Sequence, residues 1–575
     1  MQINKVCHFW NEQSKKLLLW SKRPKKIFKK RKFGYSWFLD GKINIYDNCI
    51  LKNLNKKTKN KVGIIYFNEN NIIKKFTYSD IHKKVLGIEF FLKKNFPNIS
   101  KKKVMIKSST NIDTIFFILT CVKIGAEYSV IFNDILYEGI LKRIALFKPN
   151  IFISEHNDPN LKKKLKKKRV KFINFNTIKK LNNKSQYNKN VKYFDSNKNL
   201  FTLFTSGSTG TPKGIVHSTA GFFLYTKFTA IKQFGLNYNS IMLTASDIGW
   251  LNGHNYSLFA PLSLGATTVV VKNPLSLLDK DSLRKILSCG VTILYLPVTL
   301  IRMMKSVYKD KFIFRNNTLK TLGSMGEHIA PTVAKWFAKI FTKENNCIVN
   351  AYYQTENGGI ICSPTFKDDT KKYPHGSAGN VISRYVRINK LNKQKKELKI
   401  ISPWPGCMKN VLTNSKKDWE KYWDKKNYFR MFDMATKNNN SIFIHGRNDD
   451  VINLRGKRIG CEEIESVLLE FKQISEVSAI GVPDELEGNK LYLFIVKNKI
   501  INETNIVNKI ISNFGKFAYP KKIFELKKLP KTKSGKILRR LLREMIINPS
   551  GKNYGDLTTI SDKNIIEDIK LKLND

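Results

Sequence analysis

Strand-like apolar segments alternate with helix-like amphipathic segments along the chain, and this order leaves few folds open. VGIIYF (62–67) precedes the periodic run YSDIHKKVLGIEFFLKK (78–94), and ATTVVV (266–271) precedes DSLRKILSCG (281–290). Strand, helix and strand in succession indicate βαβ units, which build mostly parallel sheets with helices on their faces. We therefore predict an α/β protein. Its 575 residues are enough for more than one domain.

The composition changes twice along the chain. Residues 156–190 are polar, rich in lysine and poor in periodicity, so we predict a charged excursion there. A second change comes at GRNDD (446–450), beyond which the chain is consistent with a small α+β domain. We predict a large N-terminal domain over residues 1–447 and a small C-terminal domain over residues 448–575.

The formal net charge is +58, which calls for an explanation. One explanation is a polyanionic partner, either nucleic acid or a membrane surface. We favour compositional drift, because lysine is spread along the chain together with asparagine, isoleucine and phenylalanine, and forms dense blocks only at 22–32 and 161–169. Since no recognised nucleic-acid module is present, we expect no specific nucleic-acid partner.

Neither membranes nor metal–cysteine chemistry is indicated. No apolar run is long enough to span a bilayer, and the N-terminus lacks the apolar segment of a signal peptide. The eight cysteines are scattered and form no CxxC pair, which argues against a zinc site and a disulfide framework. We expect a cytoplasmic protein without membrane insertion.

The segment FTSGSTGTPKGIVHS (204–218) follows an apolar, strand-like run. Its three glycines permit tight turns and leave backbone N–H groups exposed, and its serines and threonines add hydroxyl donors. It is not a Walker A loop, because Pro212 precedes Lys213 and Gly214 follows it. A loop of this composition at a strand end predicts phosphate binding.

TSGSTGTPKGIVHS resembles the phosphate loop of the adenylate-forming enzymes, a family of acyl-CoA synthetases, adenylation domains and luciferases. The resemblance implies a large N-terminal domain with parallel-rich sheets, helices and a β-barrel-like subdomain, followed by a small, mobile α+β domain. It also implies binding of ATP while a carboxylate attacks the α-phosphorus. The loop residues implied in ATP binding are Thr205, Ser206, Gly207, Ser208, Thr209, Gly210 and Lys213.

Two further segments resemble family motifs in the order that the family requires. SMGEHIAP (324–331) is similar to the adenine-site segment, and AYYQTENGGI (351–360) to the aromatic-QTE motif. The resemblance implies that Thr355 contacts the α-phosphate and that Glu356 holds Mg²⁺, for which a carboxylate oxygen is a suitable ligand. The other ATP-binding residues implied are Gly326, Glu327, His328, Tyr352, Tyr353 and Gln354.

Asp433 matches the ribose-binding aspartate of the family. The family usually has glycine on each side of it, whereas this chain has Phe432 and Met434. Arg447 and Arg458 match two arginines on the phosphate side.

Two more residues concern the domain motion and the chemistry. Asp449 matches the hinge aspartate between the two domains. Lys536, in LPKTKSGKILRR, matches the catalytic lysine, whose charge would stabilise the transition state of adenylation.

The ends of the chain resemble the short-chain acyl-CoA synthetase branch. FWNEQSKKLLLW (9–20), DGKINIYDNCI (40–50) and GDLTTISD (555–562) all match segments of that branch. The implied reaction joins acetate to CoA, with ATP converted to AMP and diphosphate through an acyl-adenylate. The implied substrates are a short-chain acid, ATP and CoA, with Mg²⁺ as cofactor.

The acyl pocket departs from the pattern of acetate enzymes, which have small aliphatic residues, a threonine and a tryptophan there. Tyr353 still blocks a long chain but is smaller than tryptophan, and a methylene is worth only about 1–3 kcal/mol in such pockets. Acetate is favoured and propionate is the alternative. The pocket residues implied are Trp250, Leu251, Asn252, Met325 and Tyr353.

The CoA site is the second departure. The branch has an Arg/Gly-rich segment where this chain has lysines, and lysine cannot form the bidentate contacts of arginine. Arg455 replaces a small residue beside the CoA channel, where it would either aid pyrophosphate binding or obstruct the tunnel, while Gly456 is retained. Two alternatives stay open: an adenylating enzyme with another acceptor, such as a carrier protein, and a basic nucleic-acid-binding protein. Monomer and homo-oligomer are both compatible with the sequence.

Overall fold

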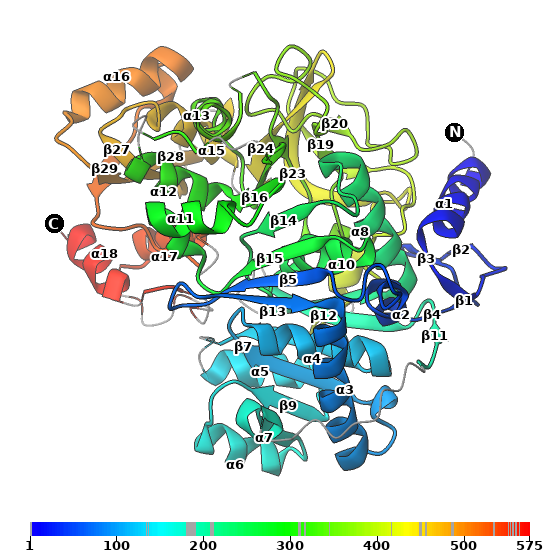
Figure 1. Cartoon of the computed structure of the whole chain (residues 1–575). Coiled ribbons are helices and arrows are strands. Elements are labelled where there is room, and N and C mark those ends of the chain that lie inside the picture. The colour runs from blue at the N-terminus through cyan, green and yellow to red at the C-terminus, as the bar shows by residue number, and fades with distance from the viewer. Residues whose placement is uncertain are drawn as a thin grey trace.

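A computed structural model of the chain describes most of its residues (Figure 1). They are residues 3–574 except 134, 136, 180–190, 207–211, 309–311, 315–317, 344, 416, 448–450, 455–456, 485–487, 533–534, 550, 552–553, 555–556, 558–559 and 563.

Two seven-stranded sheets form the large N-terminal part. The first sheet has the order β10-β9-β7-β8-β12-β13-β22 and is parallel as far as β12, after which β13 and β22 run antiparallel to their neighbours. Its strands are β7 (Lys103–Ser108), β8 (Glu127–Phe132), β9 (Ile151–Ser154), β10 (Lys171–Asn174), β12 (Asn199–Ser206), β13 (Pro212–Ser218) and β22 (Asn410–Leu412).

The second sheet has the order β18-β17-β16-β14-β15-β5-β6 and is parallel except for the β5–β6 hairpin. The predicted strand at 62–67 is confirmed as β5. The strands are β5 (Val62–Phe67), β6 (Ile73–Thr77), β14 (Ile241–Thr244), β15 (Thr267–Val271), β16 (Ile293–Pro297), β17 (Thr321–Met325) and β18 (Val349–Asn350).

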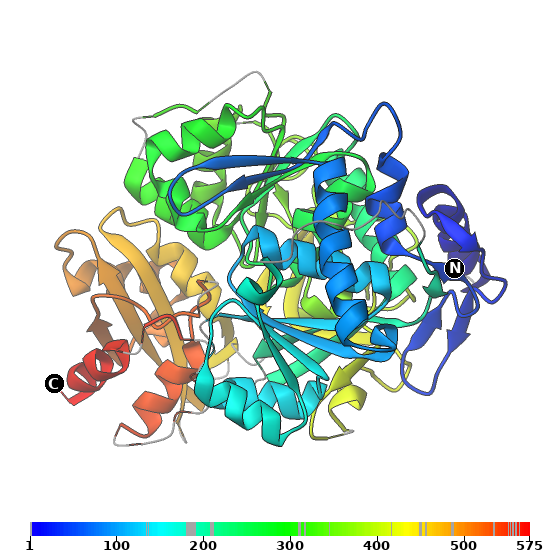
Figure 2. The same ribbon diagram turned by 60° about the horizontal axis from the view of Figure 1, so that its bottom comes forward.

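Two helices, one from each sheet, pack on each other, and each is preceded by a capping residue. Thr77 and Asp80 form a capping box at the start of α3 (Tyr78–Asn95), and Asn111 caps α4 (Ile112–Ile124). α3 packs on β5 and β6, α4 packs on β7 and β8, and the two helices pack on each other (Figure 2). One hydrophobic core therefore joins both sheets.

The predicted charged excursion at 156–190 is partly wrong, because its described residues contain regular structure. The helix α6 (Pro159–Lys167) buries Leu161 and Leu165, which are four residues apart and lie on one face. β10 pairs in parallel with β9, and the short helix α7 (Phe175–Lys179) follows. Residues 180–190 lie outside the described part of the chain.

A small three-stranded antiparallel sheet precedes the C-terminal part of the chain. It consists of β21 (Lys396–Ile400), β23 (Phe429–Asn438) and β24 (Ser441–Arg447). β24 leads directly towards the C-terminal part of the chain.

The small C-terminal part contains a five-stranded sheet that separates two cores. Along β28 (Gly488–Lys497), Leu493 and Ile495 face one core and Phe494 faces the other, as the alternation of a strand requires. In Figure 1 this part lies on the side opposite to α1 (Ile3–Leu17). The other elements are β25 (Val451–Leu454), β26 (Lys457–Gly460), β27 (Ile474–Asp484), β29 (Lys522–Glu525), α15 (Cys461–Leu468), α16 (Glu503–Phe514), α17 (Arg539–Ile547) and α18 (Asn564–Asn574).

The predicted α/β class, with a large N-terminal and a small α+β C-terminal domain, is thus confirmed. Within the described part of the chain, no helix is both long and apolar enough to cross a membrane. All eight cysteines are described, and none of them forms a disulfide.

Candidate active site

Asp433 lies at the centre of a polar cluster formed by three segments. The Tyr352 hydroxyl donates to Oδ2 of Asp433 at 2.5 Å, and Nε2 of Gln354 donates to the same oxygen at 2.7 Å. Arg447 pairs with Asp433 across β23 and β24, with its Nε 4.0 Å from Oδ1. Burial raises the pKa of Asp433 to about 6, although the positive charges of Arg447 and Lys536 oppose the shift. The Asp433 carboxylate is thus held by two hydrogen bonds to Oδ2, while its Oδ1 faces Arg447.

Phe432 stands at a position where the resemblance implies a glycine, and it adopts a positive φ. Its φ is +57°, in the left-handed region, which costs a non-glycine residue about 1–2 kcal/mol. Aromatic and cationic contacts offset this cost, because its ring lies 5.6 Å from that of Tyr422 and 4.8 Å from the Arg430 guanidinium. The missing glycine therefore does not prevent the irregular backbone of β23 at Asp433.

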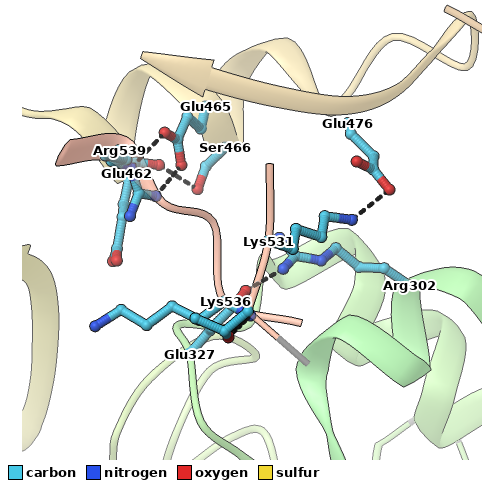
Figure 3. Close-up of polar contacts among 10 residues, drawn as sticks. Arg302, Glu327, Glu462, Glu465, Ser466, Glu476, Lys531, Lys536 and Arg539 are labelled. Carbon is cyan, nitrogen blue, oxygen red and sulfur yellow. Dashed lines mark hydrogen bonds and ion pairs between the residues drawn. The ribbon is translucent and has the colours of Figure 1, made fainter. Parts of the chain in front are cut away.

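The segment GEHIAP (326–331), which is predicted to border adenine, follows β17. Gly326 has φ +92°, a backbone conformation that glycine adopts without steric cost. Glu327 accepts a hydrogen bond from Arg302 of α12 (Val298–Tyr308), a contact shown in Figure 3. Desolvation lowers the pKa of His328 to about 4, so its ring is neutral at physiological pH.

The QTE segment is tied to the strand that follows the glycine loop. His217 of β13 donates from Nε2 to the Thr355 carbonyl at 2.7 Å, and burial lowers the pKa of His217 to about 4. Glu356 accepts from the Tyr422 hydroxyl at 2.9 Å. Nζ of Lys213 lies 5.9 Å from the centre of the Tyr422 ring. Lys213 and Glu356 are thus gathered around one tyrosine.

The two strands that flank the glycine loop form an antiparallel hairpin. Thr205 lies opposite Lys213, and Ser206 lies opposite Pro212. Gly207, Ser208, Thr209 and Gly210 lie outside the described residues, as does the side chain of Ser206.

Lys536 belongs to a C-terminal loop that contacts the N-terminal part of the chain. Its backbone carbonyl accepts from Thr532 N at 2.8 Å. Gly535 has φ +85° and lies so close to α12 that an added Cβ would stand 2.8 Å from Oγ1 of Thr299. Figure 3 shows Lys536 beside the Arg302–Glu327 pair. The positive charge of Lys536 opposes the rise in the pKa of Asp433, so the C-terminal part brings this lysine within electrostatic range of the cluster around Asp433.

Helix α15 adds a carboxyl group from the C-terminal side. Glu462 lies against Gly446, where an added Cβ would be 3.2 Å from its Cδ. Burial raises the pKa of Glu462 to about 7, and the negative charges of Glu465, Glu327 and Asp433 add to the shift, while Arg539 opposes it. Arg539 itself forms a two-point ion pair with Glu465, at 2.9 and 2.6 Å. Figure 3 shows Glu462 next to this pair.

Of the residues implied for the acyl pocket, Tyr353 and Asn252 are in direct contact. The Tyr353 hydroxyl donates to Oδ1 of Asn252. Leu251 and Met325 are buried in the core against which Tyr353 packs. Trp250 packs on Phe132, with ring centres 4.8 Å apart.

Several implied residues are not described. Asp449, Arg455 and Gly456 lie outside the described part of the chain. Arg458 lies in β26, opposite Asn453, but its side chain is not described.

The sequence motifs did not reveal four residues that complete this arrangement. They are Arg302, which binds Glu327, Tyr422, which binds Glu356, His217, which holds the QTE backbone, and Glu462. Tyr422 and Arg302 lie outside every motif, so only the tertiary structure could identify them. His217 lies inside the glycine-loop motif, and its place at the end of an apolar, strand-like run was the one feature of the sequence that could have indicated a buried, structural histidine.

The chain belongs to the AMP-binding enzyme family, whose sequence signature matches residues 51–403. The signature of the AMP-binding enzyme C-terminal domain matches residues 463–536. Within the family, residues 2–49 match the signature for the acetyl-coenzyme A synthetase N-terminus. The resemblance to this family and branch is thereby confirmed.

Curated relatives match over nearly the full length. Acetyl-coenzyme A synthetase of Helicobacter pylori (strain G27) is 31% identical over 617 aligned residues, which cover 98% of this chain and 92% of that protein. Acetyl-coenzyme A synthetase of Leptospira biflexa (strain Patoc 1 / Ames) is 30% identical, covering 99% and 94%. That of Emericella nidulans is 29% identical, covering 98% and 90%.

Solved structures share the fold. Acetoacetyl-CoA synthetase from Streptomyces lividans superposes with a TM-score of 0.83 at 14% identity, covering all of this chain and 93% of that one. The anthranilate CoA ligase AuaEII, in complex with anthranoyl-AMP, has a TM-score of 0.74 at 18% identity, covering 88% and 97%.

Proposed function

We propose that the protein is an AMP-forming acetate–CoA ligase, with propionate as the alternative acid. ATP, acetate and CoA would yield acetyl-CoA, AMP and diphosphate through an acetyl-adenylate. The similarity to acetyl-coenzyme A synthetases along nearly the whole chain supports this. The observation that carries the proposal is the docked C-terminal loop, which brings the charge of Lys536 to the cluster around Asp433.

In the first half-reaction, the N-terminal domain binds ATP. Asp433 accepts hydrogen bonds from the ribose hydroxyls, and Tyr352 and Gln354 keep its carboxylate oriented. Arg447 and Arg458 bind phosphate oxygens, and Thr355 contacts the α-phosphate. Gly326, Glu327, His328 and Tyr353 border the adenine side, while Thr205, Ser206, Gly207, Ser208, Thr209, Gly210 and Lys213 surround the β- and γ-phosphates.

Lys536 supplies the charge stabilisation of the adenylation step. Negative charge is shared between the attacking carboxylate and the α-phosphate as the new bond forms and diphosphate leaves. An ammonium group held beside these oxygens lowers the energy of that state without a proton transfer.

The residues around Glu356 fit a role in binding Mg²⁺. Its carboxylate is a hard oxygen ligand whose Oε1 is oriented by Tyr422. No group of three or more His, Cys, Asp or Glu residues in the described part of the chain could hold a metal. Glu356 would hold the ion with phosphate and water oxygens, and the ion would neutralise phosphate charge.

In the second half-reaction, the CoA thiol attacks the acyl-adenylate and AMP leaves. We propose that the C-terminal domain, residues 448–575, rotates about Asp449, removes Lys536 and brings Arg455 and Gly456 to the site. Splitting the condensation through a mixed anhydride divides one difficult step into two easier ones.

The experiment compares the two half-reactions in Lys536→Ala. Acetate-dependent exchange of diphosphate into ATP should be lost, because it requires the adenylation step, whereas acetyl-CoA formation from supplied acetyl-adenylate should persist. The exposed Lys528→Ala is the matched control and should keep both activities. Persistence of both half-reactions in Lys536→Ala would refute the role of Lys536, and turnover without CoA would indicate another acceptor. We further propose a cytoplasmic protein, either a monomer or a homo-oligomer.

A further inference from the structure

A cavity lies at the edge of the first sheet, beside β22 and apart from the candidate active site. Its volume is about 250 Å³, and its wall is completed by the tip of the β2–β3 hairpin (Phe28–Lys30 and Tyr35–Trp37) and by α14 (Lys417–Glu420). None of its lining residues is implied in binding ATP, the acid or CoA. Two of the lining side chains are cationic, two are aromatic and two are amides: Arg31, Lys409, Phe33, Trp419, Asn199 and Asn410.

The cavity and the candidate active site lie on opposite faces of β13. Successive side chains of a strand alternate between its two faces. Val216 lines the cavity, whereas the next residue, His217, donates to the Thr355 carbonyl on the other face. Lys213, which is proposed to bind phosphate, shares the face of His217, because it lies an even number of residues before it in the strand. A molecule in the cavity would therefore leave the ATP site open.

The two cations of the cavity repel each other. Nζ of Lys409 is held in place by a hydrogen bond to the Asn197 carbonyl at 2.6 Å, which uses one of its three N–H groups. Burial lowers the pKa of Lys409, and the positive charge of Arg31 lowers it further. The carboxylates of Asp195 and Glu127 oppose the shift, but neither is among the described residues that line the cavity. An anion bound between the two cations would offset both their repulsion and their loss of hydration.

Both of these carboxylates have partners of their own. Glu127 pairs with Lys103 at 3.7 Å, and Asp195 accepts from the backbone N–H of Asn197 at 2.8 Å. No ion pair joins the Arg31 guanidinium to a carboxylate in the described part of the chain. The cavity thus contains two cations without an acidic side chain of its own to balance them.

The aromatic part of the wall is held in place. Oδ1 of Asn427 accepts from the backbone N–H of Gly34 at 2.9 Å and so fixes the hairpin tip. The Trp419 ring packs against Gly34, where an added Cβ would stand 3.0 Å from Cζ2 of that ring, and its centre lies 5.5 Å from that of Trp423. Phe33 and Trp419 are both partly buried, so they offer an ordered aromatic surface to a planar ring.

We propose that this cavity is a second ligand site, which binds a small aromatic phosphate monoester. Arg31 and Lys409 bind the phosphate, while Phe33 and Trp419 contact the ring. A phosphate monoester carries about 1.5 to 2 negative charges at neutral pH, which suits two cations, and a guanidinium binds it through two N–H groups. The volume is below the roughly 300–1,000 Å³ of sites for drug-sized ligands, which favours a single ring over ATP or CoA.

The test measures the binding of phenyl phosphate to the full chain by calorimetric titration, with a non-hydrolysable ATP analogue present to fill the ATP site. Inorganic phosphate and phenol supply the charge and the ring separately. Phenyl phosphate should bind about tenfold more tightly than either of them, because ring contacts and apolar burial add to the ion pairs.

Variants then locate the site. Arg31→Gln should weaken phenyl phosphate binding about tenfold or more, the value of a charge-assisted hydrogen bond, and it should fold because Arg31 is exposed. Trp419→Leu should lower the preference for phenyl phosphate over inorganic phosphate by about threefold or more. Lys30→Gln is the matched control: it removes one positive charge from the same hairpin, but Lys30 does not line the cavity, so the affinity should be unchanged.

Four outcomes would overturn the inference. They are no binding of phenyl phosphate, binding that the ATP analogue abolishes, equal affinity for phenyl and inorganic phosphate, and equal losses in Arg31→Gln and Lys30→Gln. The last of these would attribute binding to the net charge of +58 rather than to this cavity. The ligase assignment stands or falls separately, on the half-reactions of Lys536→Ala.

Discussion

Replacing Arg539 by methionine would test how the C-terminal domain is held together. The guanidinium is 11% exposed and donates two hydrogen bonds to Glu465, which is 8% exposed and also accepts from the backbone N–H of Ala479 at 2.9 Å. Removing one partner of such a pair leaves a buried charge uncompensated and costs about 3–5 kcal/mol. Since a domain is stable by only about 5–15 kcal/mol, Arg539→Met should unfold this domain at much lower denaturant concentrations.

The assay must report on this domain alone. All eight tryptophans lie between residues 10 and 423, so their fluorescence reports on the N-terminal part. Amide hydrogen exchange of peptides from β27 and β28, measured in the full chain against denaturant, gives the free energy of opening of the C-terminal sheet. The N-terminal sheets provide the internal reference.

Two further variants make the prediction specific. Lys531→Met breaks an ion pair with Glu476 that is more exposed, at 22% and 30%, and should cost no more than about 1 kcal/mol. Glu465→Gln combined with Arg539→Met should recover part of the loss, because the buried charge is gone. Equal costs for Arg539→Met and Lys531→Met would refute the reasoning.

Two other predictions concern the site itself. Gly535→Ala should slow adenylation at least tenfold, because the added methyl group meets Thr299 and displaces the loop that carries Lys536. Gly290→Ala is the control: it has the same strain of a positive φ, but its added Cβ meets nothing closer than 3.4 Å, so adenylation should be unchanged. Equal adenylation rates in the two variants would contradict this prediction. The pKa of Asp433 is raised to about 6, so ionisation of its carboxyl group lowers the folding stability as the pH rises from about 4 through 6. Ribose binding needs the ionised carboxylate, so the affinity for adenosine, measured by calorimetric titration, should increase over the same pH range. Asp433→Asn should abolish this pH dependence of adenosine affinity. A pH profile unchanged in Asp433→Asn would show that another group titrates.

The strands and helices with clear periodicity could be predicted from the sequence. The run 78–94 became α3, and 62–67 became β5, because both their apolar spacing and their boundaries agree with the buried faces. The helix α6 was missed because lysine dominates its composition. Only Leu161 and Leu165 reveal its buried face, and two residues are too few for a periodic signal.

The candidate site was accessible from the sequence only where a motif contains it. Asp433 and Lys536 could be named from their motifs, but their proximity depends on the contact of Gly535 with α12. The partners Arg302 and Tyr422 come from ordinary-looking segments, whose role arises from tertiary packing alone. The positive φ of Phe432 could not be predicted either, because the contacts that offset its energetic cost come from the Tyr422 ring and the Arg430 guanidinium, which only the tertiary structure brings to it.

One turn of α12 contacts two separate segments: the C-terminal loop that contains Gly535 and the N-terminal segment that contains Glu327. Thr299 receives the lysine loop, and Arg302, three residues later on the same face, holds Glu327. Natural variation at this turn is therefore constrained from two directions. A residue of α12 that suits Glu327 is acceptable only if the C-terminal loop that contains Gly535 still fits beside it. Substitutions in the segment around Glu327 and in this loop should therefore occur together rather than separately.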